Sequence, residues 1–134
     1  MTMSTSAIDL FNYRRRPTSV VHIGAIDMGG DNPIRIQSMT TTNTNDTDGC
    51  VAQAERIIRA GGELVRLTTQ GSREAENLKN INAGIRADGF DTPLVADIHF
   101  NPHVADVAAL YAEKVRINPG NYVDPARKFI HQEY

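Results

Sequence analysis

Four segments of the chain contain apolar residues that, at a spacing of two, form one continuous apolar face, which is typical of β-strands. They comprise residues 33–40, 63–70, 93–100 and 114–121. In front of them, residues 18–23 and the segment after Gly24 predict a short β-hairpin, with residues 29–33 as turn material. We expect residues 1–17 to form an N-terminal tail that lies outside the folded domain.

Between the predicted strands, apolar residues recur every three or four positions, which predicts amphipathic helices. Ser72 and Asn101 are the predicted N-caps of the second and third helices, and Pro102 occupies the favoured first helical position of the third. The helices are expected over about residues 50–60, over 73–88 and from 102 onward, with a further helix starting at Asp124 and Pro125.

This alternation, with about 20–30 residues from strand to strand, predicts right-handed crossovers and a parallel sheet. Open doubly wound sheets and (β/α)₈ barrels both begin in this way. A doubly wound sheet is apolar on both faces, whereas a barrel interior becomes polar near the carboxyl ends of its strands. Here only one face is apolar, which favours the barrel. The residues expected beneath the helices are Ile34, Ile36, Ser38, Val65, Leu67, Leu94, Ala96, Ile98, Val115 and Ile117.

The chain has 134 residues, of which 40% are hydrophobic and 22% charged, as expected of a globular protein. Its net charge of −2 gives no reason to expect nucleic-acid or membrane binding. A (β/α)₈ barrel needs about 250 residues. Residues 18–134 are therefore expected to be the N-terminal part of a TIM barrel, about four strands long, within a longer protein. Pairing of two half-barrels in a homodimer is the alternative.

The chain contains a single cysteine, Cys50, on the apolar side of the first predicted helix. One cysteine excludes an internal disulfide and any cysteine-rich metal site made by this chain alone. It also indicates a reducing compartment, so we expect a cytoplasmic protein.

Polar side chains gather at the predicted carboxyl ends of the strands, where (β/α)₈ barrels carry their active sites. Arg66 and Arg116 come from different strands and point inward, and guanidinium groups bind phosphate through a planar fork. Asp97 and His99 lie two residues apart on one strand face, where the carboxylate could orient the imidazole. The candidate substrate-binding residues are Gln37, Arg66, Asp97, His99, Arg116, Asn118 and Asn121.

Plainer interpretations of these residues stay open. The arginines could pair with Asp97 and glutamates inside a filled barrel, although two arginines leave a positive excess over one aspartate. His99 could be an ordinary core histidine, and the Asn-Pro pairs at 101–102 and 118–119 could be turn chemistry alone.

Four motifs, IRIQSMT, GGELVRLTTQG, LVADIHFNP and EKVRINPGN, occur in this order along the chain. Together they resemble the N-terminal barrel of the 4-hydroxy-3-methylbut-2-enyl diphosphate synthase family over roughly residues 10–134. The resemblance implies the reductive ring opening of 2-C-methyl-D-erythritol 2,4-cyclodiphosphate in the methylerythritol phosphate pathway of isoprenoid biosynthesis. It also implies a [4Fe-4S] cluster, flavodoxin or ferredoxin as electron donor, and a homodimer at full length.

The resemblance further implies roles for single residues. Arg66 and Arg116 match arginines that grip the diphosphate, and Asn118 matches an asparagine beside it. Asp97 and His99 match a strand-end pair in the same pocket.

In this family the cluster is held by three cysteines and a glutamate of a C-terminal domain, and Cys50 matches none of them. We therefore expect no metal ligand in this chain and no turnover by the chain alone. Two other functions stay open, namely a barrel enzyme similar to dihydropteroate synthase and a non-catalytic phosphate-binding module.

Overall fold

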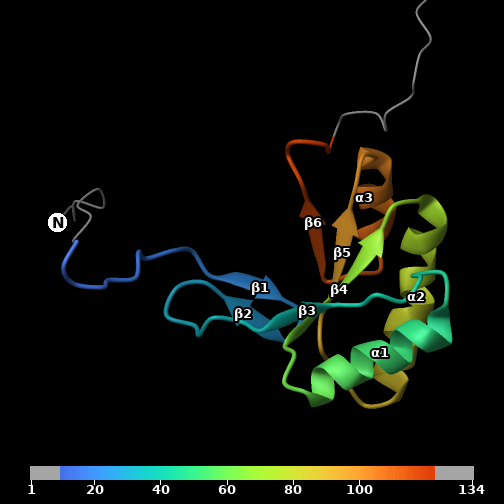
Figure 1. Cartoon of the computed structure of the whole chain (residues 1–134), viewed down its shortest axis with the longest axis horizontal. Helices are drawn as coiled ribbons and strands as arrows, with labels where there is room; N and C mark the ends of the chain where they lie inside the picture. Colours follow the sequence, from blue (N-terminus) through green and yellow to red (C-terminus); the bar gives the residue numbers. More distant parts are fainter. Residues whose placement is uncertain (1–9, 123–134) are drawn as a thin grey trace, which may run out of the picture.

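A computed structural model, which describes residues 10–122, shows a β-hairpin followed by four parallel strands that alternate with three helices (Figure 1). The hairpin and the alternating parallel unit are thus confirmed, while the helix predicted from Asp124 lies outside the described residues. The parallel strands lie in the order β3-β4-β5-β6, so β4, β5 and β6 each pair with the strand before them in the chain. The elements are β1 (Val21–Ile23), β2 (Ile26–Met28), β3 (Gln37–Met39), α1 (Thr47–Arg59), β4 (Leu64–Thr69), α2 (Ser72–Ala87), β5 (Leu94–Ile98), α3 (Pro102–Ala108) and β6 (Lys114–Ile117).

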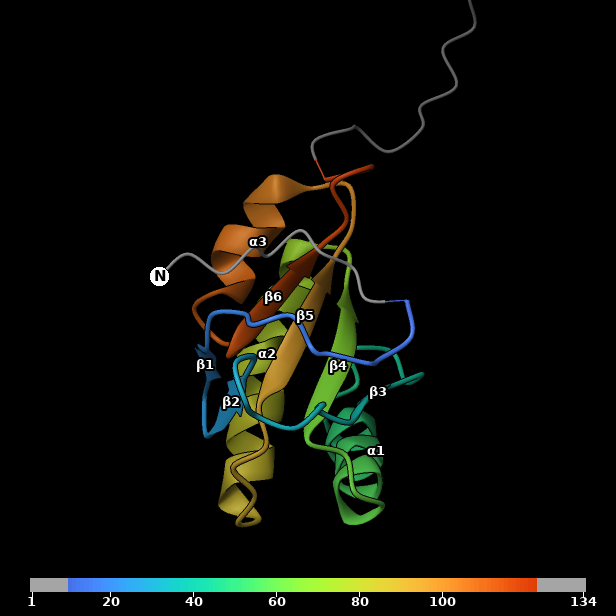
Figure 2. The same cartoon turned by 90° about the vertical axis from the view of Figure 1, so that its left-hand side faces the viewer.

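All three helices lie on the same face of the parallel sheet (Figure 2). The apolar residues of β4 and β5 on this face are completely buried, as their alternation predicts. Burial of each large side chain stabilises the fold by about 1.5–3 kcal/mol. The largest side chains of this core are Leu67, Leu78, Ile81, Ile85, Leu94 and Ile98.

The opposite face of the sheet is apolar only near the amino ends of its strands, where the hairpin packs against it. Ile23 of β1 forms a small separate cluster with Leu64 of β4 and Val95 of β5, and all three are nearly fully buried. Met28 of β2 packs against the edge of this cluster. The hairpin therefore covers the amino-terminal end of this face and leaves the carboxyl-terminal end to polar side chains.

Arg35 anchors the hairpin to the sheet. Its Nε donates a hydrogen bond to the carbonyl oxygen of Asp27 at 2.9 Å, and its Nη1 donates to Glu63 Oε2 at 2.8 Å. The hydrogen bond from Arg35 is the main reason why the pKa of the Glu63 carboxyl lies below its ordinary value. Arg35 therefore acts as a link between β2 and the start of β4.

The first parallel strand is shorter than predicted, and its apolar residues are not covered. β3 comprises only Gln37–Met39, and Ile34 and Ile36 are 81% and 59% exposed. The prediction that they pack beneath the helices is wrong because they precede the paired part of the strand, where no described helix covers the sheet. Ile117 is 40% exposed at the end of β6, beyond which no described strand extends the sheet.

The first helix begins at Thr47, three residues before the predicted start at Cys50. The reason is Asp46, whose side chain accepts a hydrogen bond from the Gly49 N–H at 3.0 Å and caps the helix. The polar residues before Cys50 therefore form the first turn of α1 rather than the end of the loop.

The second helix begins at Ser72, and Gly71, not Ser72, occupies its N-cap position without a side-chain hydrogen bond. The third begins at Pro102 with Asn101 as its N-cap, as predicted, and the Asn101 side chain accepts from His103 N–H at 3.1 Å. No helix within residues 10–122 combines the length and the apolar character needed to cross a membrane.

Glu113 ties the start of β6 to β5 and α2. Its Oε2 accepts from the Leu94 N–H at 2.8 Å, and its Oε1 accepts from Arg86 Nη2 at 2.7 Å and Asn82 Nδ2 at 3.0 Å. Burial by itself raises the pKa of this carboxyl, but the hydrogen bonds from Leu94, Asn82 and Arg86 together outweigh burial and lower it.

We expect the stabilisation by Glu113 to be lost in acid. Because its folded-state pKa is lowered, the contribution is present above the unfolded pKa of about 4.3 and disappears as the pH falls through the folded pKa. Glu113→Gln should therefore lower the free energy of unfolding of the full-length protein at pH 7, and by less near pH 3. Urea unfolding at both pH values measures this, with the exposed Glu76→Gln as control. A difference that does not depend on pH contradicts the prediction.

Candidate functional site

The register of the parallel strands places polar residues in one row near the carboxyl ends of the strands. Thr68 of β4 and Arg116 of β6 are the pairing partners of Asp97 on β5. Residues in one row point to the same face, and neighbouring strands lie about 4.8 Å apart. Three consecutive strands therefore bring side chains to one place, on the face that the hairpin leaves uncovered.

The carboxylate of Asp97 is the common partner of three basic side chains. Its side chain is only 4% exposed, and its Oδ1 accepts from Arg116 Nη1 at 2.9 Å. Its Oδ2 lies 3.1 Å from His99 Nε2 and 3.8 Å from Arg66 Nε. A carboxylate so deeply buried is stable only when it is paired, so Asp97 holds the three side chains together. We call these four residues the Asp97 cluster.

The Asp97 cluster carries an excess of positive charge. Two permanent cations, Arg66 and Arg116, share one carboxylate, and His99 adds a third positive charge when it is protonated. Within residues 10–122 neither arginine pairs with a glutamate. The two side chains are 31% and 38% exposed, and the Nε of Arg66 is buried without a hydrogen-bond partner among the described residues. The unused donors suit an anion with several acceptor oxygens, such as a phosphate.

Met39 belongs beside this cluster, although it is not among the residues predicted from the sequence. It pairs with Arg66 in the sheet register, and its Sδ accepts a hydrogen bond from Arg66 Nη2 at 3.4 Å. A thioether is a weak acceptor, so Met39 supports the guanidinium without neutralising it. Continuing the alternation from Gln37 by two residues places Met39 on the same face, and that signal could have found it.

The other three predicted residues lie outside the Asp97 cluster. Gln37 is exposed at the start of β3, level with Leu64 rather than with Asp97. Asn118 follows β6 and forms a turn, since its Oδ1 accepts from the Gly120 N–H and its carbonyl from the Asn121 N–H, both at 3.0 Å. The Oδ1 of Asn121 is buried without a partner among the described residues. Ligand contacts by these three residues remain predictions.

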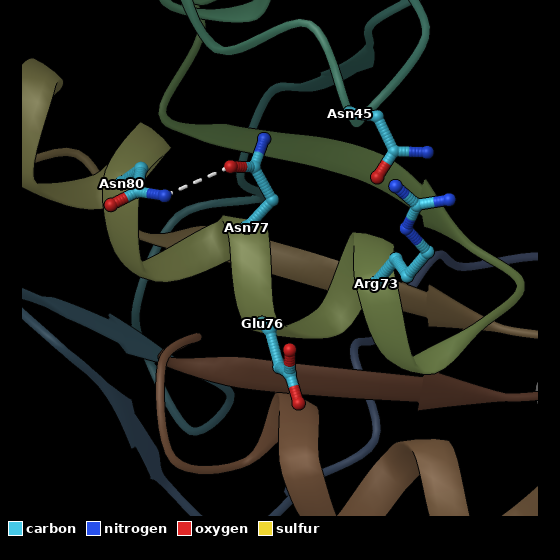
Figure 3. Close-up of a pocket in the computed structure, with 5 residues that line it drawn as sticks. All are labelled: Asn45, Arg73, Glu76, Asn77 and Asn80. Atoms are coloured by element: carbon cyan, nitrogen blue, oxygen red, sulfur yellow. Dashed lines mark hydrogen bonds between the residues drawn. The ribbon is translucent and has the colours of Figure 1, made fainter.

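A separate surface pocket of about 340 Å³ lies between α2 and the loop before α1. Figure 3 shows Arg73 and Asn45 facing one another, Asn77 hydrogen-bonded to Asn80, and Glu76 pointing away from the other residues. Asn77 also donates to the Thr44 carbonyl at 2.8 Å and accepts from the Thr47 hydroxyl at 3.0 Å. These contacts fix the loop before α1, so this pocket reflects the way in which the helices are joined.

The described residues do not fit an iron–sulfur cluster. Among residues 10–122 there is no group of three or more His, Cys, Asp or Glu side chains that could hold a metal ion. Burial, with a smaller contribution from the charge of Asp46, raises the pKa of the Cys50 thiol, which donates to the Asn43 carbonyl at 3.2 Å. Cys50 is also the single cysteine of the chain, whereas an iron–sulfur cluster is held by several cysteines, so Cys50 by itself cannot hold one.

Comparison with known proteins agrees with the motifs in the sequence. The GcpE TIM-barrel domain family matches residues 18–132. The 4-hydroxy-3-methylbut-2-en-1-yl diphosphate synthase (flavodoxin) of Phocaeicola vulgatus is 74% identical over 127 residues, covering 95% of this chain and 21% of that protein. The synthases of the same name from Bacteroides fragilis and Chlorobaculum tepidum are 72% and 50% identical, covering 95% and 93% of this chain and 20% and 17% of theirs.

The chain thus spans about a fifth of the length of the curated relatives that it matches. The match runs through all four motifs and through the whole of the hairpin and parallel sheet, so the resemblance based on these motifs is confirmed. This chain belongs to the GcpE TIM-barrel domain family.

Proposed function

We propose that this chain forms the diphosphate-binding part of a 4-hydroxy-3-methylbut-2-en-1-yl diphosphate synthase. The whole enzyme would open the ring of 2-C-methyl-D-erythritol 2,4-cyclodiphosphate reductively, in isoprenoid biosynthesis by the methylerythritol phosphate pathway. The observation that carries the proposal is the Asp97 cluster, in which two arginines and a histidine from neighbouring strands converge on one buried carboxylate. The similarity to 4-hydroxy-3-methylbut-2-en-1-yl diphosphate synthases supports the choice of reaction.

In this proposal Asp97 prepares the site before the ligand arrives. It holds Arg116 by a direct hydrogen bond and Arg66 by a looser ion pair, so two guanidinium groups stay close together despite their repulsion. Donors that are already in position bind an anion without a further ordering cost. The incoming phosphate oxygens would then accept the donors that Asp97 does not use.

The chain's part is substrate binding, and the electron transfer belongs to other parts of the protein. The chain has a single cysteine, Cys50, which cannot hold a [4Fe-4S] cluster by itself, so the cluster ligands are proposed to lie outside this chain. The proposed electron donor is flavodoxin, in preference to ferredoxin, because the names of the relatives include flavodoxin. A homodimer at full length and a cytoplasmic location complete the proposal.

The proposal is tested by removing Arg116 from the full-length protein. Arg116→Ala should weaken the binding of the cyclic diphosphate and of inorganic diphosphate alike, by about 10- to 100-fold. This range corresponds to the loss of one charge-assisted hydrogen bond of about 1.5–3 kcal/mol. Isothermal titration calorimetry of each ligand measures the change.

Arg56→Ala is the matched control, because Arg56 is exposed on α1 and loses the same charge. It should bind both ligands as the wild type does. Equal affinities of wild type and Arg116→Ala would show that Arg116 does not contact the ligand. If both variants weakened binding equally, the effect would come from the loss of net charge and not from the position of Arg116.

A further inference from the structure

A cavity of about 350 Å³ lies where β3 and β4 end. It is lined by residues 40–44, in the loop after β3, and by Thr68, Gln70 and Glu74 from the end of β4 and the start of α2. None of these described lining residues is a lysine or an arginine. The wall therefore offers hydroxyls, amides and one carboxylate, which can hydrogen-bond the hydroxyl groups of a ligand, and these lining residues carry no positive charge that would favour a phosphate.

The loop that forms one wall is held firmly. Gln53 of α1 accepts from the N–H groups of Thr41 and Thr42 at 2.9 and 3.0 Å through its Oε1, and its Nε2 donates to the Thr41 hydroxyl at 2.9 Å. The Thr44 hydroxyl donates to the Thr68 carbonyl at 2.7 Å, which ties the loop to β4. The cavity therefore has a preformed wall, as a binding site needs.

Thr40 is the residue of this wall whose side-chain hydroxyl is buried without a hydrogen-bond partner among the described residues. The residue is only 5% exposed. A buried hydroxyl without a partner destabilises a fold, so such groups are rare outside sites where another molecule supplies the bond. This observation, independent of the shape of the cavity, points to a ligand that can exchange a hydrogen bond with a hydroxyl.

The cavity adjoins the Asp97 cluster. Thr68, in its wall, pairs with Asp97 in the register of β4 and β5, and the Thr40 N–H donates to the Arg66 carbonyl at 2.9 Å. Adjacent strands lie about 4.8 Å apart. A small molecule whose phosphates contact Arg66 and Arg116 therefore has its carbon skeleton within reach of this wall.

We propose that the cavity binds the hydroxyl-bearing carbon portion of a polyol diphosphate whose phosphates lie at the Asp97 cluster. The inference rests on the proposed function and adds a second contact region to it. The hydroxyls of Thr40 and Thr68 exchange hydrogen bonds with ligand hydroxyls, and the carboxylate of Glu74 accepts from them. The cluster supplies the attraction for the charge, and the cavity distinguishes the polyol from other diphosphates.

The test compares two ligands on variants of the full-length protein. Thr40→Val and Thr68→Val replace a hydroxyl by a methyl group of similar size. Each should weaken the binding of the cyclic polyol diphosphate by about three- to tenfold, the loss expected for one hydrogen bond. Each should leave the binding of inorganic diphosphate, which has no carbon skeleton, unchanged. Thr92→Val, a substitution of another buried threonine just before β5, should change neither affinity.

Unchanged binding of the polyol diphosphate by both variants, or equal weakening of both ligands, overturns the inference and leaves the assignment of the Asp97 cluster intact. A wild-type protein that binds neither ligand overturns the proposed function itself. Thr40→Val should also unfold at the same urea concentration as the wild type or a higher one, because its hydroxyl has no partner to lose. Unfolding at a clearly lower concentration shows that the hydroxyl has a structural partner and also overturns the role of Thr40.

Discussion

Asp97→Asn should lower the free energy of unfolding of the full-length protein by about 2–3 kcal/mol. Breaking a buried ion pair by removing one partner costs about 3–5 kcal/mol, and the effect is smaller here because Arg66 and Arg116 are about one third exposed to screening solvent. Two guanidinium groups would then face one another without a counter-charge. Urea unfolding at pH 7 measures the loss.

Asp106→Asn is the control, because it removes the same charge from an exposed position on α3. It should change the free energy of unfolding by less than about 0.5 kcal/mol, as is usual for surface substitutions. If the Asp97 and Asp106 variants were equally stable, the Asp97 carboxylate would not be the group that holds the cluster together.

Leu67→Ala should destabilise the full-length protein by about 2–5 kcal/mol, toward the upper end of that range. Leu67 is completely buried between β4 and the helices, so the substitution removes apolar contacts and leaves a cavity that the sheet cannot close. The midpoint of urea unfolding should fall with little change in slope.

The same substitution at Leu110 serves as the comparison. Leu110 is 73% exposed in the turn after α3, so it has little buried surface to lose. Leu110→Ala should be nearly neutral. If both substitutions lowered the free energy of unfolding by a similar amount, the layer between the sheet and the helices would not be the main core.

Burial in the sheet was predictable from the sequence wherever a helix packs against the apolar face of a strand. β4 and β5 are central strands, and their apolar face is buried as expected. Ile34 and Ile36 alternate in the same way yet are exposed, because alternation reports which residues share a face and not whether anything covers that face. The start of α1 was missed because Asp46 caps a helix that begins at Thr47, three residues before the predicted start at Cys50.

The candidate site was predictable in part, for a similar reason. Asp97 and His99 on an otherwise apolar strand stood out, and the parallel register brings Arg66 and Arg116 to them. The position of Gln37 was not predictable, because the sequence does not show where β3 begins to pair with β4. The observed register places Gln37 beside Leu64 and not beside Asp97. That the hydroxyl of Thr40 lacks a partner was not predictable, because only a three-dimensional structure shows it.

The order of the sheet has a consequence for the synthesis of the chain. β4, β5 and β6 each pair with the strand before them, and successive parallel strands begin about 20–30 residues apart. A ribosome adds that many residues in about 1–6 s at about 5–20 residues per second, whereas a helix forms in about a microsecond. Every new strand therefore emerges when its partner has already been made. We expect the sheet to grow one strand at a time, from β3 toward β6, in the direction of translation.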